Sequence, residues 1–115
     1  MQQMTKSQKR HLRDLAAPAY DRELSAALSE LHGHFARWQA DEIDSWELNE
    51  LVHKHHNGIS RDIYSAYTGS NPVMPVARAL VKRFLGWDEV REDCKPLLSS
   101  MVEYFSNEDN DASEA

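Results

Sequence analysis

The chain has only one cysteine, Cys94, among its 115 residues, so no internal disulfide can form. Its start lacks the apolar segment of a secretory signal, and together with the single thiol this predicts a reducing, cytoplasmic setting. No apolar run approaches the roughly 20 residues that a membrane-spanning helix requires. From the sequence we therefore expect no membrane partner.

The motifs of common enzyme classes are also missing. The sequence contains no G-x-S-x-G, no glycine-rich phosphate loop and no C-x-x-C, and it has four glycines in total. Cys94 has no histidine close by in the sequence that would activate it. The acids Glu89, Glu92 and Asp93 fall in a polar stretch that is typical of a solvated turn. These absences favour a protein that is not an enzyme.

Basic residues are in the minority. Thirteen Lys and Arg residues stand against nineteen Asp and Glu residues, which gives a formal net charge of −6. Because nucleic-acid binding depends mainly on neutralising phosphates, this balance argues against a nucleic-acid partner. Nucleic-acid binding is therefore the least favoured hypothesis, and it would depend on one of two local basic clusters. The first cluster comprises Lys6, Lys9, Arg10 and Arg13, and the second comprises Arg78, Lys82 and Arg83.

Strand-like alternation is absent, and apolar residues instead recur at three- and four-residue steps. A first helix is predicted over Leu12–Ala40, with a kink or break near Ala16–Pro18. Its inward seam is predicted from the 4, 3, 4, 3 spacing typical of helices that pack at a shallow angle. The seam residues are Leu24, Leu28, Leu31, Phe35 and Trp38.

A second helix is predicted over Asp44–Thr68. Asp44 is a natural N-cap, and Glu47 three residues later fits a capping box. The dipeptide Asn57-Gly58 is a turn signal and marks a weak point. The apolar stripe continues past it, so we predict one helix. The short linker before Asp44 predicts that the two long helices form an antiparallel hairpin.

Shorter elements follow the hairpin. A third helix is predicted over Pro75–Leu85, with Gly86 as the residue after its C-cap. A last helix is predicted over Leu97–Phe105, followed by a disordered acidic tail at 107–115. The predicted fold class is all-α: a four- or five-helix bundle built on a long antiparallel helical hairpin, with a single domain over residues 1–106.

The helix over Asp44–Tyr67 is predicted to have three faces. One is charged, and a second is an apolar stripe that faces the first helix, made of Leu48, Leu51, Val52, His55, Ile59, Ile63 and Ala66. The third alternates aromatic rings with polar side chains and comprises Trp46, Asn49, His53, His56, Ser60, Tyr64 and Tyr67. Either the two C-terminal helices cover this third face, or a molecule outside the chain does.

Aromatic rings with polar tips are typical of recognition surfaces. The leading hypothesis is therefore a non-catalytic interaction or regulatory protein that acts through a protein partner or as a homodimer. The residues expected to make the contact are Trp46, His53, His56, Tyr64 and Tyr67. In this hypothesis the aromatic residues anchor the partner and the histidines select it.

The alternative is a bundle that binds a metal or a small ligand. Antiparallel counting brings His32 near Leu51, so His32, His53 and His56 are candidate ligands for a transition metal such as zinc. A calcium-binding EF-hand is excluded, because the loop that would end at Glu47 lacks three oxygen ligands and the obligatory glycine.

Overall fold

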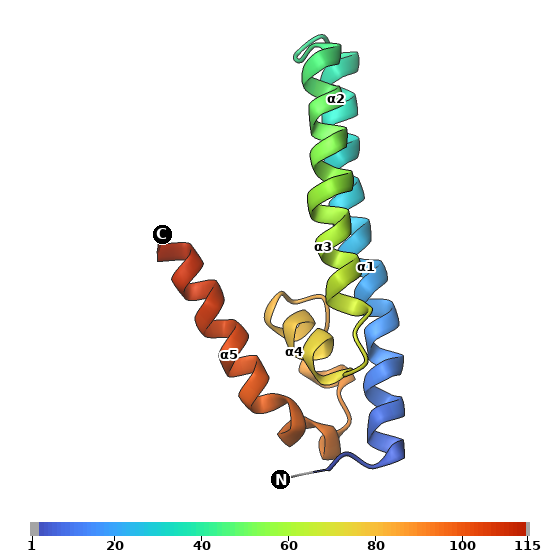
Figure 1. Cartoon of the computed structure of the whole chain (residues 1–115), viewed down its shortest axis with the longest axis vertical. Helices are drawn as coiled ribbons and strands as arrows, with labels where there is room; N and C mark the ends of the chain where they lie inside the picture. The colour runs from blue at the N-terminus through green and yellow to red at the C-terminus, as the bar shows by residue number, and fades with distance from the viewer. Residues whose placement is uncertain (1–2, 115) are drawn as a thin grey trace. The chain divides into compact units, whose positions relative to one another are not determined.

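The computed structural model of the protein describes the backbone of residues 3–114 and the side chains of residues 3–108. Over this range the chain is helical and has no strand, so the predicted all-α class is confirmed. None of the described helices is long and apolar enough to cross a lipid bilayer. The elements, labelled in Figure 1, are α1 (Lys6–Gln39), α2 (Ser45–Lys54), a π-helical segment (His55–Ser60), α3 (Arg61–Tyr67), α4 (Val73–Val81), two 3₁₀ turns (Trp87–Glu89 and Glu92–Cys94) and α5 (Lys95–Glu114).

Helix α1 begins with a reciprocal capping box. The backbone N–H of Thr5 donates to Oε1 of Gln8 at 2.9 Å, and the N–H of Gln8 donates to Oγ1 of Thr5 at 3.1 Å. The helix then continues for 34 residues with Pro18 inside it. The break expected near Ala16–Pro18 therefore does not occur, because apolar positions on both sides of the proline stay in phase and hold the helix together by packing.

The chain divides into two compact units. Unit 1 comprises residues 1–19 and 69–115, and unit 2 comprises residues 20–68. Helix α1 contributes its first part to unit 1 and its second part to unit 2. The single domain predicted over residues 1–106 stays a prediction.

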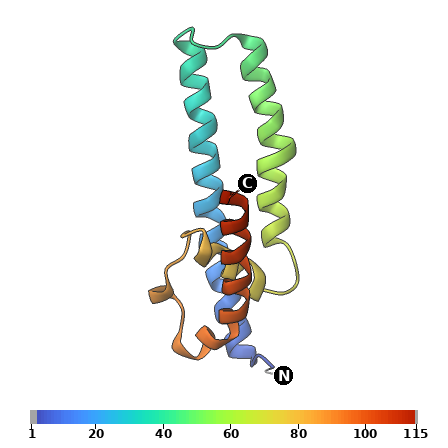
Figure 2. The ribbon, with the colours of Figure 1, turned by 90° about the vertical axis from the view of Figure 1, so that its left-hand side faces the viewer.

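Unit 2 is the predicted antiparallel hairpin, in which the second part of α1 lies beside α2, the π segment and α3 (Figure 2). The turn is made by Asp41, whose φ of 60° is left-handed. The N–H of Glu42 donates to the carbonyl of Arg37 at 2.9 Å, which is the long-range bond of a Schellman motif. The side chain of Asp44 then accepts from the N–H of Glu47 at 2.8 Å, so the predicted N-cap is confirmed.

The predicted weak point of the second helix is a π-helical segment over His55–Ser60, which contains Asn57 and Gly58. The helix does not end there, and α3 follows without a turn. A π segment fits one extra residue into a helix. One extra residue turns the residues that follow by about 100° around the helix axis. The residues of α3 therefore do not lie on the faces of α2 with which a regular α-helix would align them.

Unit 1 has its core between the first part of α1, α4 and α5, and α4 packs closely on α5. Two hydrogen bonds join α1 to the loop before α5. Nε2 of Gln8 donates to the carbonyl of Asp93 at 2.9 Å, and Nε2 of His11 accepts from the N–H of Arg91 at 3.0 Å. The buried apolar residues of this core are Leu12, Leu15, Ala19, Val76, Ala77, Ala79, Leu80, Leu85, Val90, Cys94 and Leu98.

Two predicted helix ends in unit 1 are wrong. Helix α4 ends at Val81 rather than Leu85, because Arg83, with a φ of 67°, takes the left-handed position expected of Gly86. The N–H of Phe84 donates to the carbonyl of Ala79 at 2.9 Å and closes that Schellman motif. Helix α5 runs to Glu114, past its predicted end at Phe105 and through most of the tail for which the sequence predicts disorder. The side chains of 109–115 lie outside the described residues.

Candidate interaction surfaces of the helical hairpin

The five residues expected to bind a partner do not share one environment. Trp46 is 84% exposed and Tyr64 is 59% exposed, which makes them the two most uncovered large apolar side chains among the described residues. His53 and His56 are also exposed. Tyr67, in contrast, is half-buried. Four of the five residues are thus placed where a second molecule can reach them.

Tyr67 belongs to the interior of the hairpin. Its ring stacks on that of Tyr20 with centroids 4.9 Å apart and planes 16° apart. Its hydroxyl donates to Oε1 of Glu23 at 2.9 Å, and Glu23 is a buried carboxyl. Because a buried polar group needs hydrogen-bond partners, Tyr67 joins the two helices and acts as a structural residue.

The π segment explains why the predicted third face divides. In a regular α-helix Trp46 and Tyr67 would lie on the same side. The extra residue accommodated over 55–60 turns Tyr67 toward α1 and leaves Trp46 facing away. The sequence signals the segment only through Asn57-Gly58, which does not distinguish a π segment from an ordinary helix end.

The three histidines proposed as metal ligands are all exposed: His32 on α1, His53 on α2 and His56 in the π segment. Among the side chains that the structure describes, no group of three or more His, Cys, Asp or Glu is arranged to hold a metal ion. The structure therefore does not bring His32, His53 and His56 together as a site.

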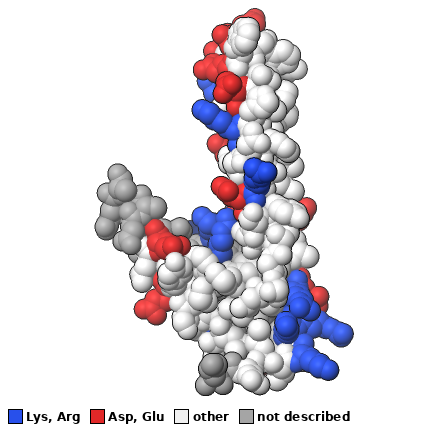
Figure 3. Space-filling view, viewed as in Figure 1, with Lys and Arg blue, Asp and Glu red and all other residues white. Residues whose placement is uncertain are grey.

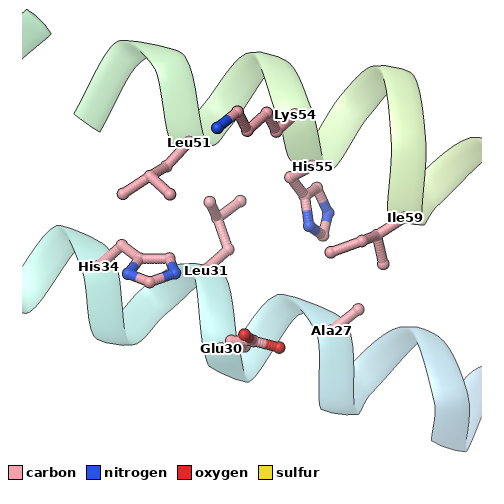
Figure 4. Close-up of a pocket in the computed structure, with 8 residues that line it drawn as sticks. All are labelled: Ala27, Glu30, Leu31, His34, Leu51, Lys54, His55 and Ile59. Atoms are coloured by element: carbon pink, nitrogen blue, oxygen red, sulfur yellow. The ribbon is translucent and has the colours of Figure 1, made fainter. Parts of the chain in front are cut away.

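A cavity of about 170 Å³ lies on one side of the hairpin, between α1 and the helix that follows the turn (Figure 4). Leu31 and Leu51 point toward each other there, and His34, Lys54 and His55 lie around them. Leu51 thus pairs with Leu31, one residue from the predicted pairing with His32. His55 was expected in the core and is half-buried in this cavity.

A second hollow, a groove of about 260 Å³, lies near the open end of the hairpin and shares no lining residue with this cavity. We call it the Tyr64 groove. Tyr20, Leu24 and Tyr64 form its apolar part, and the other four lining residues are polar or basic. Its lining residues are Tyr20, Leu24, His56, Asn57, Ser60, Arg61 and Tyr64.

The inward seam predicted for α1 is partly wrong. Leu28 is 49% exposed and Phe35 is 40% exposed, whereas Glu23 and Ala27 are buried. The helix is rotated so that the line through Glu23 and Ala27 faces its neighbour. Alanine is only weakly apolar and a glutamate is normally expected in solvent, so the spacing of apolar residues favoured the larger side chains as the inward seam. Leu28 and Phe35 are therefore additional candidate contact residues that the sequence reasoning placed in the core.

Charge is distributed unevenly on the described surface. Lys6, Lys9, Arg10 and Arg13 gather around a shallow cavity near the start of α1, which Figure 3 shows as a basic patch. Acidic side chains gather at the turn of the hairpin, and Glu42 pairs there with Arg37 at 3.6 Å. Between these regions the flank of α1 is largely uncharged in the same view.

One ion pair in unit 1 shifts the titration of its members. Nη2 of Arg91 donates to Oδ2 of Asp93 at 2.8 Å, and this hydrogen bond lowers the pKa of Asp93 and raises that of Arg91. Burial, followed by the charge of Asp93, raises the pKa of the neighbouring Cys94 thiol. Because a nucleophilic cysteine requires a lowered pKa, Cys94 has the character of a core residue.

The fold and its exposed side chains define a helical-hairpin protein with uncovered apolar surface. No family model, curated protein or solved structure matches the chain.

Proposed function

We propose that the protein acts without catalysis, by binding protein through the exposed side chains of its helical hairpin. One observation carries the proposal: the hairpin leaves six of its large apolar side chains exposed. Trp46, Tyr64, Leu28, Ile59, Phe35 and Trp38 are 84, 59, 49, 45, 40 and 38% exposed, respectively. Exposed apolar groups that cluster on one element are typical of protein contact sites, whereas isolated ones are common on any surface.

Trp46 is the strongest single anchor in this proposal. It stands in the first turn of α2, next to the capped and therefore well-defined helix start at Asp44. Tryptophan is the residue type most often responsible for binding energy at protein interfaces, because it buries a large area at little cost in side-chain entropy. Its exposed ring on a rigid helix start fits that role.

The test uses a photoreactive amino acid in the full chain, in cells. Placed at Trp46, it is expected to cross-link to a defined protein. Placed at Glu47, the neighbouring exposed residue on another side of the helix, it is expected to cross-link far less. Equal yields at positions 46 and 47, or none at either, would contradict the role of Trp46. The same probe at Tyr64 and Phe35 tests the rest of the hairpin. If no position gives a cross-linked protein, the proposed function is overturned.

A further inference from the structure

A basic stripe runs along the first turns of α1 (Figure 3). Its residues are spaced i, i+3, i+4 and i+7, which places them on one side of the helix. They are Lys6, Lys9, Arg10 and Arg13. All four are exposed, and they surround a shallow hollow of about 330 Å³ whose other lining residue is Asp14. In the part of the chain that the structure describes, none of the four side chains has a hydrogen bond or an ion pair.

The rest of unit 1 holds this part of α1 in place. On the side of the helix away from the stripe, Leu12 and Leu15 are buried. Gln8 and His11 form the two hydrogen bonds to the loop before α5. The capping box of Thr5 and Gln8 already occupies the start of the helix. The four cations are therefore presented by an ordered helix, so a ligand does not bear the entropic cost of forming it.

The position of the stripe is unfavourable for the stability of the helix. The first turn of α1 contains Lys6 and Lys9 and no acidic residue, although the N-terminal end of a helix dipole favours negative charge. Like charges three or four residues apart also repel each other on a helix. An anion bound across the four side chains reduces both costs. Packing within unit 1 does not explain this cluster, whereas binding of an anion does.

We infer that the basic stripe binds a short acidic segment of a partner protein. From Lys6 to Arg13 the stripe is about 10 Å long, which is the length of about two helical turns. A segment with carboxylates on one side over that length pairs with all four cations. The guanidinium groups of Arg10 and Arg13 can each hold a carboxylate by two parallel hydrogen bonds. The stripe belongs to unit 1, so the inference is independent of the function proposed for the hairpin of unit 2.

Two other classes of anionic partner match the stripe less well. The phosphates of a nucleic acid continue far beyond a length of about 10 Å. Without the four positive charges of the stripe, the net charge of −6 becomes −10 for the rest of the chain, which repels that continuation. The hollow also has no aromatic lining residue on which a base could stack. A helix that binds a membrane surface inserts its apolar face, and the apolar face of this part of α1 is buried in unit 1.

The test measures the fluorescence anisotropy of a labelled octaglutamate peptide that is titrated with the full-length chain. Saturable binding is expected, and it should weaken as salt is added. Lys9→Glu should raise the dissociation constant at least about tenfold, because it replaces an attraction by a repulsion in the middle of the stripe. The same substitution should raise the melting temperature, since it places an acid in the first turn of α1 and removes a like-charge repulsion. The loss of binding is then not a loss of folding.

Two further variants separate the stripe from the net charge of the chain. Lys54→Glu makes the same change in charge at an exposed residue of unit 2, and should change the dissociation constant less than about twofold. Asp14→Asn should lower the dissociation constant about twofold to fivefold, because Asp14 is the one acidic residue that lines the hollow and it repels the peptide. A gain in affinity at this position does not arise from a damaged fold.

The absence of saturable binding would overturn the inference, as would equal losses from Lys9→Glu and Lys54→Glu. A short DNA duplex and vesicles of phosphatidylserine and phosphatidylcholine are titrated in parallel. If either binds more tightly than the peptide and Lys9→Glu abolishes that binding, the stripe takes a nucleic acid or a lipid surface, and the acidic protein segment is excluded. Cross-linking at position 46 tests the hairpin separately, so the proposed function stands or fails independently of these results.

Discussion

Asp41 and Arg83 are the two described residues other than glycine with a left-handed backbone, and each closes a helix with a Schellman motif. The sequence predicted glycine in such a position, at Gly86, because glycine has no Cβ to clash. Aspartate is one of the few other residues that tolerate this conformation, so Asp41 could have been recognised. Arginine has no such preference, and Arg83 is placed there by the packing of the residues around it.

A substitution at Asp41 tests this backbone requirement. The Asp41→Gly variant should be more stable than Asp41→Ala by about 1 kcal/mol, because only alanine keeps the clash between Cβ and the backbone. The wild-type chain should fall between the two variants. The free energy of unfolding in urea measures the order, and an alanine variant as stable as the glycine variant would contradict it.

The hydroxyl of Tyr67 gives a second residue-scale prediction. Tyr67→Phe keeps the stack on Tyr20 and removes the hydrogen bond to the buried Glu23, which should cost about 1–2 kcal/mol of stability. Tyr64→Phe is the matched control. Its ring is 59% exposed, so its stability should change by less than about 0.5 kcal/mol. Equal losses in thermal denaturation would remove the distinction between the two tyrosines.

The pair of Arg91 and Asp93 gives a pH dependence. The hydrogen bond from Arg91 lowers the pKa of Asp93 in the folded chain, so the pair stabilises the fold above the ordinary carboxyl pKa. This contribution is lost as the pH falls through the lowered pKa. Asp93→Asn should therefore be less stable than the wild type at pH 7, and the difference should disappear in acid. A difference that is constant from neutral to acidic pH would contradict this origin.

At the scale of the element, the sequence predicted the two long helices and the capped turn between them. Asp44 with Glu47, and apolar residues at regular three- and four-residue steps, are local signals that packing does not override. Which side of each helix faces the other is not local. It depends on the small residue Ala27, the carboxyl of Glu23 and the π segment, none of which has a distinct sequence pattern. For that reason the hairpin was predicted and its contact surface was not.

The π segment leads to a prediction about deletions. Because it accommodates one extra residue, deleting Gly58 should convert residues 55–60 into a regular α-helix and keep Ile63 and Tyr67 facing α1. We expect stability within about 1 kcal/mol of the wild type. Deleting Glu50, an exposed residue of α2, should cost much more, since it turns the downstream residues by about 100°. Circular dichroism during urea titration compares the two, and equal losses would show that residues 55–60 hold no spare residue.

At the scale of the whole molecule, α1 is shared by the two compact units without a break. Its apolar residues keep one phase from Leu12 to beyond Ala27, and so the sequence contains no signal of a boundary near Ala19. The same continuity is the reason to expect one cooperative domain over residues 1–106. If unit 1 unfolds, the first part of α1 loses the residues that pack on it. The hairpin then retains only the second part of α1.

The burial of Cys94 makes this expectation testable by thiol labelling. The thiol is fully buried in unit 1, and unit 2 has no cysteine, so a thiol reagent reacts only when unit 1 opens. When unit 1 closes faster than the reagent reacts, the labelling rate of the folded chain divided by that of the unfolded chain gives the free energy of opening. We expect it to equal the free energy of global unfolding measured in urea. A clearly smaller value would mean that unit 1 opens while the hairpin stays folded. The single cysteine, which first served only to exclude a disulfide, would then report the separate stability of one half of the molecule.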